Sequence, residues 1–223
     1  MTGSTPVALV VGGLDGARGL VAAALAQAGW ALALNYPSGR AAAERRVAEL
    51  REAGTPAVGL FAGLGQEGTG AVLVRRAVDD LGRLDAVVLD PPPPSAAPFE
   101  ALAERGLDDV LAVGLLGPHR VARAALPALR ASGGRLVIVA RGGGTLGGLV
   151  GGGLAAWAAV LGHELAPSGI AVGCVAVDLP GASPAPGASG EEAVAGAVAA
   201  LLAGERPAPG DRVDVSSPLS SRP

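Results

Sequence analysis

Three polar side chains stand at the ends of predicted strands, and their types would allow chemistry on a carbonyl group. Arg141 ends one apolar run, and Asp90 and Asp178 each follow another. In open α/β sheets, ligands bind outside the carboxyl ends of the strands, where a guanidinium or a carboxyl group could polarise a carbonyl. These three residues are the candidate catalytic groups. The alternative, which we favour, is that Arg141 pairs with a neighbouring acid and that the aspartates cap loops.

Other catalytic patterns are missing from the sequence. The two histidines, His119 and His163, have no metal-ligand spacing, and no Ser-His-Asp, Cys-His or paired-carboxylate arrangement is spaced for catalysis. The single cysteine, Cys174, lies in an apolar run, which predicts a buried and unreactive thiol. We therefore expect no metal site, and structural roles for both histidines.

Apolar runs alternate with helical segments from one end of the chain to the other. Strands are predicted at residues 7–11, 30–34, 58–61, 85–89, 135–140, 171–177 and 212–215. Helices are predicted at residues 18–29, 41–53, 71–81, 107–116, 120–130, 154–165 and 191–203. Continuous apolar strands separated by amphipathic helices predict an α/β fold, a doubly wound parallel sheet of the Rossmann type with about seven strands. We expect a single domain over residues 1–223, with residues 216–223 as a frayed tail.

Composition excludes several classes of partner. All 17 basic residues other than histidine are arginine, but the net charge is -3 and the arginines are scattered among acids, so no nucleic-acid surface is expected. The uncharged stretch 142–162 is long enough to span a bilayer. Its many glycines, however, predict a glycine-rich loop over 142–153 followed by a buried helix. Without a predicted signal or membrane segment, we expect a cytoplasmic protein.

Several segments resemble, in order and in spacing, the short-chain dehydrogenase/reductase family. They are residues 8–13, 34–36, 81–85, 124–127, 134–137 and 164–170, and the last marks the end of the helix that carries the family's Tyr-x-x-x-Lys pair. The resemblance covers nearly the whole chain. It implies the Rossmann-type fold, a dinucleotide cofactor, and catalysis by an Asn, a Ser, a Tyr and a Lys.

The nucleotide site implied by the resemblance is altered. Gly12 and Gly16 match the family's glycine-rich turn, but its Thr is Val11 here and its last Gly is Arg18. The Asp that contacts adenine in the family corresponds to Gly63. After the fourth strand, the family's Asn-Asn-Ala-Gly is replaced by Asp90 and four prolines, which donate no backbone hydrogen bonds. Gly12 and Gly16 are therefore interpreted as vestiges of the site.

The catalytic positions implied by the resemblance are altered too. The Asn corresponds to Gly114, and the Ser to Arg141 or, with a slip of one residue, to Ala140. The Pro-Gly that borders the nicotinamide corresponds to residues 177–178. The chain has no lysine, and its one tyrosine, Tyr36, ends the second predicted strand, far from the position of the Tyr-Lys pair. No other residue type replaces that acid and its activating base.

The first functional hypothesis is therefore a non-catalytic subunit that binds no cofactor. It would assemble with an active ketoreductase-type paralogue, or with itself, through the family's pairing helices, which here contain His119 and Trp157.

Two alternatives stay open. One is a non-redox enzyme of the cyclase or dehydratase type in secondary metabolism, which would use Arg141, Asp90 or Asp178 and an apolar wall formed by 142–153. The other is an atypical NADPH-dependent ketoreductase, in which substrate or water supplies the proton. It would bind NADPH through Gly12, Gly16, Arg18 and Arg40, the last at a 2′-phosphate. The sequence indicates no particular substrate, partner or oligomer size.

Overall fold

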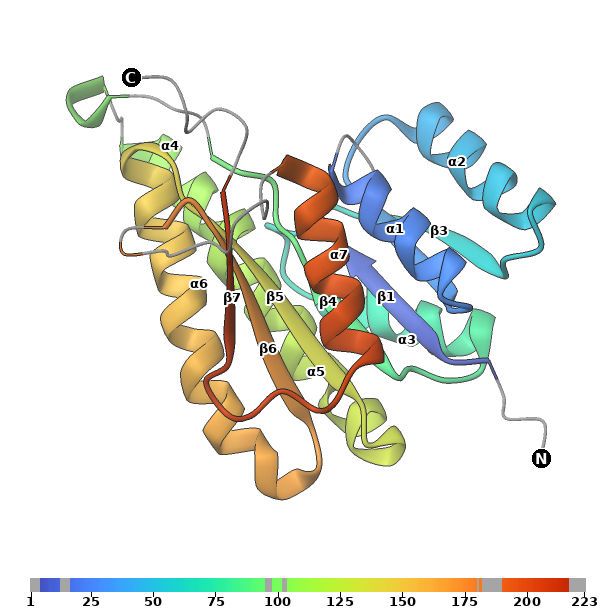
Figure 1. Cartoon of the computed structure of the whole chain (residues 1–223). Helices are drawn as coiled ribbons and strands as arrows, with labels where there is room; N and C mark the ends of the chain where they lie inside the picture. The colour runs from blue at the N-terminus through green and yellow to red at the C-terminus, as the bar shows by residue number, and fades with distance from the viewer. Residues whose placement is uncertain are drawn as a thin grey trace.

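The structure is a computed structural model that describes residues 5–12, 17–94, 98–101, 104–179, 181 and 190–216. Its centre is a parallel sheet in the order β3-β2-β1-β4-β5-β6-β7, seen in Figure 1, which confirms the predicted fold class. The strand order reverses between β1 and β4, the point where such sheets form a ligand crevice. The strands are β1 (Val7–Val11), β2 (Ala31–Tyr36), β3 (Ala57–Phe61), β4 (Ala86–Leu89), β5 (Arg135–Arg141), β6 (Ala171–Val177) and β7 (Arg212–Val215).

Helices cover both faces of the sheet (Figure 1). Side chains of α1, α2 and α7 share one buried cluster with Val10, Leu32 and Val137, and those of α3, α5 and α6 share the opposite cluster with Leu9 and Ile138. The central strands are thus buried on both faces, which explains their continuous Val, Leu and Ala runs. The helices are α1 (Ala17–Gln27), α2 (Arg40–Glu52), α3 (Thr69–Leu81), α4 (Glu104–Leu111), α5 (Gly117–Ser132), α6 (Gly144–Leu165) and α7 (Gly190–Ala203).

The two helices predicted between β4 and β5 form one continuous helical run. A π-helical turn, Ala112–Leu116, joins α4 directly to α5. The sequence shows no such join, because Gly114, Gly117 and Pro118 resemble a break between helices. Single π turns inside longer helices occur frequently at functional sites.

The prediction of a loop over 142–153 is wrong, because α6 begins at Gly144 and includes most of that segment. Glycine lowers intrinsic helix stability by roughly 1 kcal/mol per residue relative to alanine. Here tertiary packing offsets that cost, since Leu146, Val150 and Leu154 are buried. The glycines between them let the helix backbone approach the end of the sheet.

One helical stretch of the described chain is long and apolar enough to cross a membrane by length and composition. It is Gly144–Ser168, with a mean hydropathy of 1.5 and 33% of its most apolar window buried. The core helix of a soluble protein passes the same test. Because α6 packs against β5 and β6, it acts in this fold as part of the layer that covers the sheet.

Candidate functional site

Two of the three candidate catalytic residues contact each other at the carboxyl edge of the sheet. Arg141 ends β5 and Asp90 follows β4, and these strands are neighbours. Nε and Nη2 of Arg141 donate to Oδ1 and Oδ2 of Asp90 at 2.8 and 3.0 Å. Asp90 is fully buried and the side chain of Arg141 is only 11% exposed. This geometry is a buried, two-pronged ion pair, the strongest form of guanidinium–carboxylate contact.

A third residue, Glu191, completes the cluster. Nη1 of Arg141 donates to both carboxylate oxygens of Glu191 at 3.3 and 3.2 Å. Burial alone would lower the pKa of Arg141, but the hydrogen bonds and charge of Asp90, and then of Glu191, outweigh it and raise that pKa above its ordinary value. Arg141 therefore stays a cation at any physiological pH and cannot donate a proton. We call Arg141, Asp90 and Glu191 the ion triad.

Sequence reasoning missed Glu191, although a signal for it exists. It lies in the first turn of α7, and in a doubly wound sheet the helix N-termini face the same edge as the carboxyl ends of the strands. Asp178 follows β6, beside the end of β5, with a left-handed φ of 50°. Its N–H donates to the Val215 carbonyl at 3.1 Å.

In its first two turns, the backbone of α6 lies in direct contact with the backbone at the end of β5. A Cβ added at Gly151 would overlap the Arg141 carbonyl, and one at Gly147 would lie 2.7 Å from the Gly142 carbonyl oxygen. The two glycines are four residues apart and so share one helix face. That spacing equals the spacing of the Tyr-x-x-x-Lys pair that the resemblance implies on this helix. Neither position has room for any side chain without movement of the backbone.

The π turn meets α6 in a similarly close contact. A Cβ at Gly114 would lie 2.8 Å from a methyl carbon of Val150. Beside this contact is a pocket of about 210 Å³ with mostly apolar walls. It is lined by Pro92, Pro93, Pro94, Asp109, Val110, Val113, Gly114 and Val150. The prolines after β4 and Val150 of α6 thus line the same small, mostly apolar pocket.

The ends of β1 to β3 carry a different set of groups. Gly12 has φ 130°, and a Cβ there would overlap the Asp90 carbonyl, so this tight turn requires glycine. Gly16 and the side chain of Arg18 lie outside the described residues. Asn35 is fully buried, and its amide nitrogen donates to the carbonyls of Leu60 and Ala62 at 3.1 and 3.0 Å. Its Oδ1 has no hydrogen-bond partner.

Arg40 begins α2 and lies over the ring of Phe61, 4.8 Å from the ring centroid, which is cation–π distance. No described acid forms an ion pair with Arg40. Gly12 and Arg40 could hold the adenosine side of a dinucleotide, because the turn at Gly12 requires glycine and Arg40 is a cation without an acid partner among the described residues. The unpaired Oδ1 of Asn35 is fully buried and lines no pocket of the described residues. The expected adenine-contacting position, Gly63, offers only backbone.

The remaining sequence-predicted residues lie away from this edge of the sheet. Cys174 is buried as expected, and burial raises the pKa of its thiol to about 11, so it is protonated at neutral pH. His119, on α5, lies 5.9 Å from Trp157, on α6, between ring centroids. Among the described residues, no three His, Cys, Asp or Glu side chains are grouped to hold a metal.

The sequence profile of the family described as short chain dehydrogenase matches residues 6–182 of this chain. Two curated relatives are a versicolorin reductase of Emericella nidulans, 33% identical over 132 residues, and an uncharacterized oxidoreductase of Methylorubrum extorquens, 33% identical over 111 residues. These alignments cover 59% and 50% of this chain, but 50% and 45% of the relatives. The chain thus spans about half the length of the curated relatives it matches.

Solved structures agree over almost the full length. A dehydrogenase/reductase from Sinorhizobium meliloti superposes with a TM-score of 0.85 at 27% identity, covering 95% of this chain and 93% of that one. L-sorbose reductase from Gluconobacter frateurii, solved with NADPH and L-sorbose, superposes with a TM-score of 0.84 at 17% identity, covering 96% and 95%. At 17% identity, the similarity to L-sorbose reductase shows a shared fold and nothing more. With the profile match over residues 6–182, the chain belongs to the short-chain dehydrogenase family.

Proposed function

We propose that this protein is an atypical NADPH-dependent reductase of the short-chain dehydrogenase family, which binds its cofactor but supplies no proton from a tyrosine. The observation that carries the proposal is the cation that follows β2. Arg40 lies over the ring of Phe61 and has no acid partner among the described residues. An arginine without a carboxylate partner suits the 2′-phosphate of NADPH.

The names of the similar proteins support a cofactor-binding reductase over a subunit that binds no cofactor. The Emericella nidulans relative is named a reductase, and the Gluconobacter frateurii reductase was solved with NADPH. Under the proposal, the turn at Gly12 approaches the pyrophosphate and Arg40 holds the 2′-phosphate. The bound cofactor would supply a hydride to a carbonyl carbon.

The chain's own residues would position the reactants without transferring a proton. Arg141 stays charged, and its Nε, Nη1 and Nη2 are all engaged by carboxylates. The helix face that would carry the family's Tyr and Lys is glycine packed on backbone. The proton for the product alkoxide would then come from substrate or solvent, and positioning alone would sustain the reaction.

The test is NADPH oxidation with an activated diketone as probe substrate. If solvent supplies the proton, the rate at constant pH should rise with the concentration of buffer acid, because no protein group competes with it. A rate independent of buffer, with a bell-shaped pH profile, would show a protein acid and overturn the proton assignment. NADPH binding without any oxidation would overturn the reductase proposal.

A second candidate is a non-catalytic subunit, which the glycine packing of α6 favours. The same fold presents exposed apolar side chains on α6 and on the π turn, namely Leu149, Val160 and Leu116 at 49%, 61% and 49% exposure. His119 and Trp157 lie on the same pair of helices. Under this candidate, those helices bind a second copy or an active paralogue.

Co-elution with a ketoreductase-type paralogue encoded nearby tests the second candidate. Val160→Arg should abolish co-elution without unfolding the chain, because Val160 is largely exposed. Arg45→Ala serves as a surface control, because Arg45 is exposed on α2, outside the proposed interface. Absence of affinity for every such paralogue would remove this candidate.

A further inference from the structure

The small pocket beside the π turn has a position and a lining that bear on the substrate. Its walls come from residues 92–94 after β4, from Val110 and Val113 on the helical run of α4 and the π turn, and from Val150 on α6. We call it the proline pocket. Ligands of doubly wound sheets bind outside the carboxyl ends of the strands, where the strand order reverses, and β4 is one of the two strands at that reversal.

The chain connects the proline pocket directly to the turn that is proposed to contact the cofactor. The Asp90 carbonyl lies so close to Gly12 that a Cβ on this glycine would overlap it. Pro92, in the pocket wall, follows Asp90 by two residues. Since consecutive Cα atoms are about 3.8 Å apart, a group bound in the proline pocket lies beside the proposed cofactor.

The side chains that line the proline pocket offer no hydrogen-bond donor. Proline has no N–H, and the one polar side chain of the lining, Asp109, is exposed and only accepts hydrogen bonds when ionised. The N–H groups of Val110, Val113 and Gly114 belong to a continuous helical run, in which they bond to preceding turns. A carbonyl or carboxylate in the pocket would lose water and gain no donor, which is unfavourable. The pocket therefore suits a neutral apolar group.

The walls of the proline pocket are stiff, so its size limits what it holds. The proline ring fixes φ, and valine has one strongly preferred side-chain rotamer in a helix. Gly114 already lies against the side chain of Val150, so the π turn and α6 cannot approach further. A cavity of about 150 Å³ holds benzene. At about 210 Å³, the proline pocket has room for one ring with a short substituent, and a second fused ring would extend beyond its walls.

We propose that the proline pocket holds the non-reacting end of the substrate, a neutral apolar group the size of one six-membered ring. The carbonyl to be reduced lies outside the pocket, beside the cofactor. The hydride of NADPH goes to the carbonyl carbon and a solvent proton goes to its oxygen, which gives an alcohol and NADP⁺. This inference rests on the proposed reductase function and names its substrate class, ketones that carry a single apolar ring.

The first test is NADPH oxidation by the whole chain with three diketones. They are diacetyl and the two analogues in which a phenyl or a naphthyl group replaces one methyl group. We expect kcat/KM to rise about tenfold from methyl to phenyl, because the ring is buried in the pocket. From phenyl to naphthyl it should change less than about twofold, because the second ring gains no further wall.

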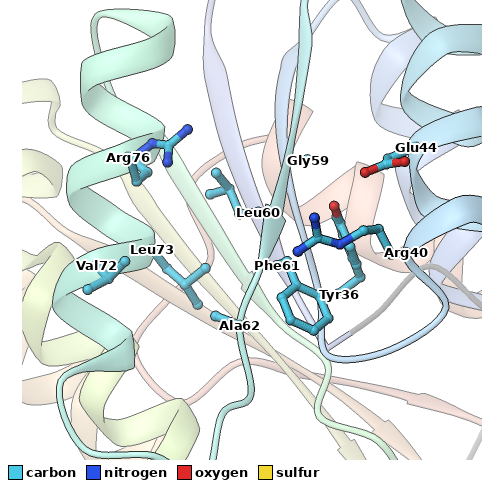
Figure 2. A pocket seen from close by; sticks show the side chains of 10 residues that line it. All are labelled: Tyr36, Arg40, Glu44, Gly59, Leu60, Phe61, Ala62, Val72, Leu73 and Arg76. Atoms are coloured by element: carbon cyan, nitrogen blue, oxygen red, sulfur yellow. The ribbon is translucent and has the colours of Figure 1, made fainter.

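A matched pair of variants separates the pocket from the intrinsic reactivity of the diketones. Val110→Phe fills the proline pocket from a half-buried position. Val72→Phe adds the same ring at a 44% exposed position on α3 beside β3 (Figure 2), outside this pocket. Val110→Phe should lower the phenyl-to-methyl ratio of kcat/KM about tenfold, and Val72→Phe should leave this ratio unchanged.

A binding measurement tests the pocket without turnover. Fluorine NMR follows para-fluorotoluene added to the whole chain, and we expect saturable binding that Val110→Phe weakens about tenfold and Val72→Phe does not change. Binding with this pattern but without oxidation of any diketone supports the ligand class of the pocket and rejects only the reductase function. No saturable binding, equal binding by the two variants, or a further tenfold gain from phenyl to naphthyl would each overturn the inference.

Discussion

The two halves of the sheet's carboxyl edge differ in how far their polar groups are satisfied. At the ends of β1 to β3, Arg40 has no acid partner among the described residues and the buried Oδ1 of Asn35 has no donor. At the ends of β4 and β5, Arg141 is held by Asp90 and Glu191. The proposed cofactor contact, Arg40, lies in the first half, whereas the charged groups of the second half pair with one another.

Glycine has opposite roles in the two halves. At Gly12 it keeps a tight turn beside β4 that a nucleotide phosphate also requires. At Gly147 and Gly151 it lets α6 approach β5 so closely that no side chain fits. The same residue type thus permits a tight turn against Asp90 in one half and the close approach of α6 to β5 in the other.

The largest effect should follow from opening the ion triad. Asp90→Ala leaves the guanidinium of Arg141 buried without its principal partner, which should lower the free energy of unfolding by about 3–5 kcal/mol. Urea denaturation measures this change. Glu191→Ala is the control, because its side chain is 40% exposed, and it should cost less than about 1 kcal/mol. Equal costs for the two variants would mean that the triad is not a closed, buried unit.

Two neighbouring glycines of α6 allow a sharper test of how closely this helix packs on the end of β5. Gly151→Ala places a Cβ against the Arg141 carbonyl, whereas Gly152→Ala meets nothing within 4 Å. The first should destabilise the chain by about 2–3 kcal/mol through overpacking, and the second should stabilise it by about 0.5–1 kcal/mol through helix propensity. Thermal unfolding compares them. Stabilisation by both would contradict the packing of α6 on β5.

A smaller, pH-dependent effect should come from Cys174 on β6. Burial raises its thiol pKa from 9.0 to about 11, so the native state keeps the proton where the unfolded state loses it. The associated stability is fully present below pH 9 and should be lost between about pH 9 and 11, by up to about 2.7 kcal/mol. Urea midpoints across that range should fall less steeply in Cys174→Ala. Identical slopes would indicate that water reaches the thiol.

The fold was predictable because its signals are local and repeated. Apolar runs such as 7–11 and 171–177 match β1 and β6 to the residue. The start of α6 was not predictable, because glycine propensity opposes a helix there and only contact with β5 stabilises it. The Arg141–Asp90 contact followed from their places at strand ends, and the favoured pairing of Arg141 with an acid is present.

Other parts of the site depend on tertiary contacts alone. Glu191 lies 50 residues from Arg141, so its place in the first turn of a helix indicates the edge of the sheet it faces but not its contact with Arg141. The unmet Oδ1 of Asn35 depends on how β2 and β3 lie side by side. Whether Arg141, Asp90 or Asp178 takes part in catalysis stays a prediction.

Titration of the purified chain with NADPH, followed by the fluorescence of its two tryptophans, tests the central claim most directly. If the ends of β1 to β3 hold the cofactor, the chain should bind NADPH saturably, with a submillimolar dissociation constant. Arg40→Ala should weaken it about tenfold through loss of a charged contact, while Arg45→Ala, on the same helix, should leave it unchanged. No detectable binding at millimolar NADPH would show that the β1–β3 half does not receive the cofactor, and would contradict the account.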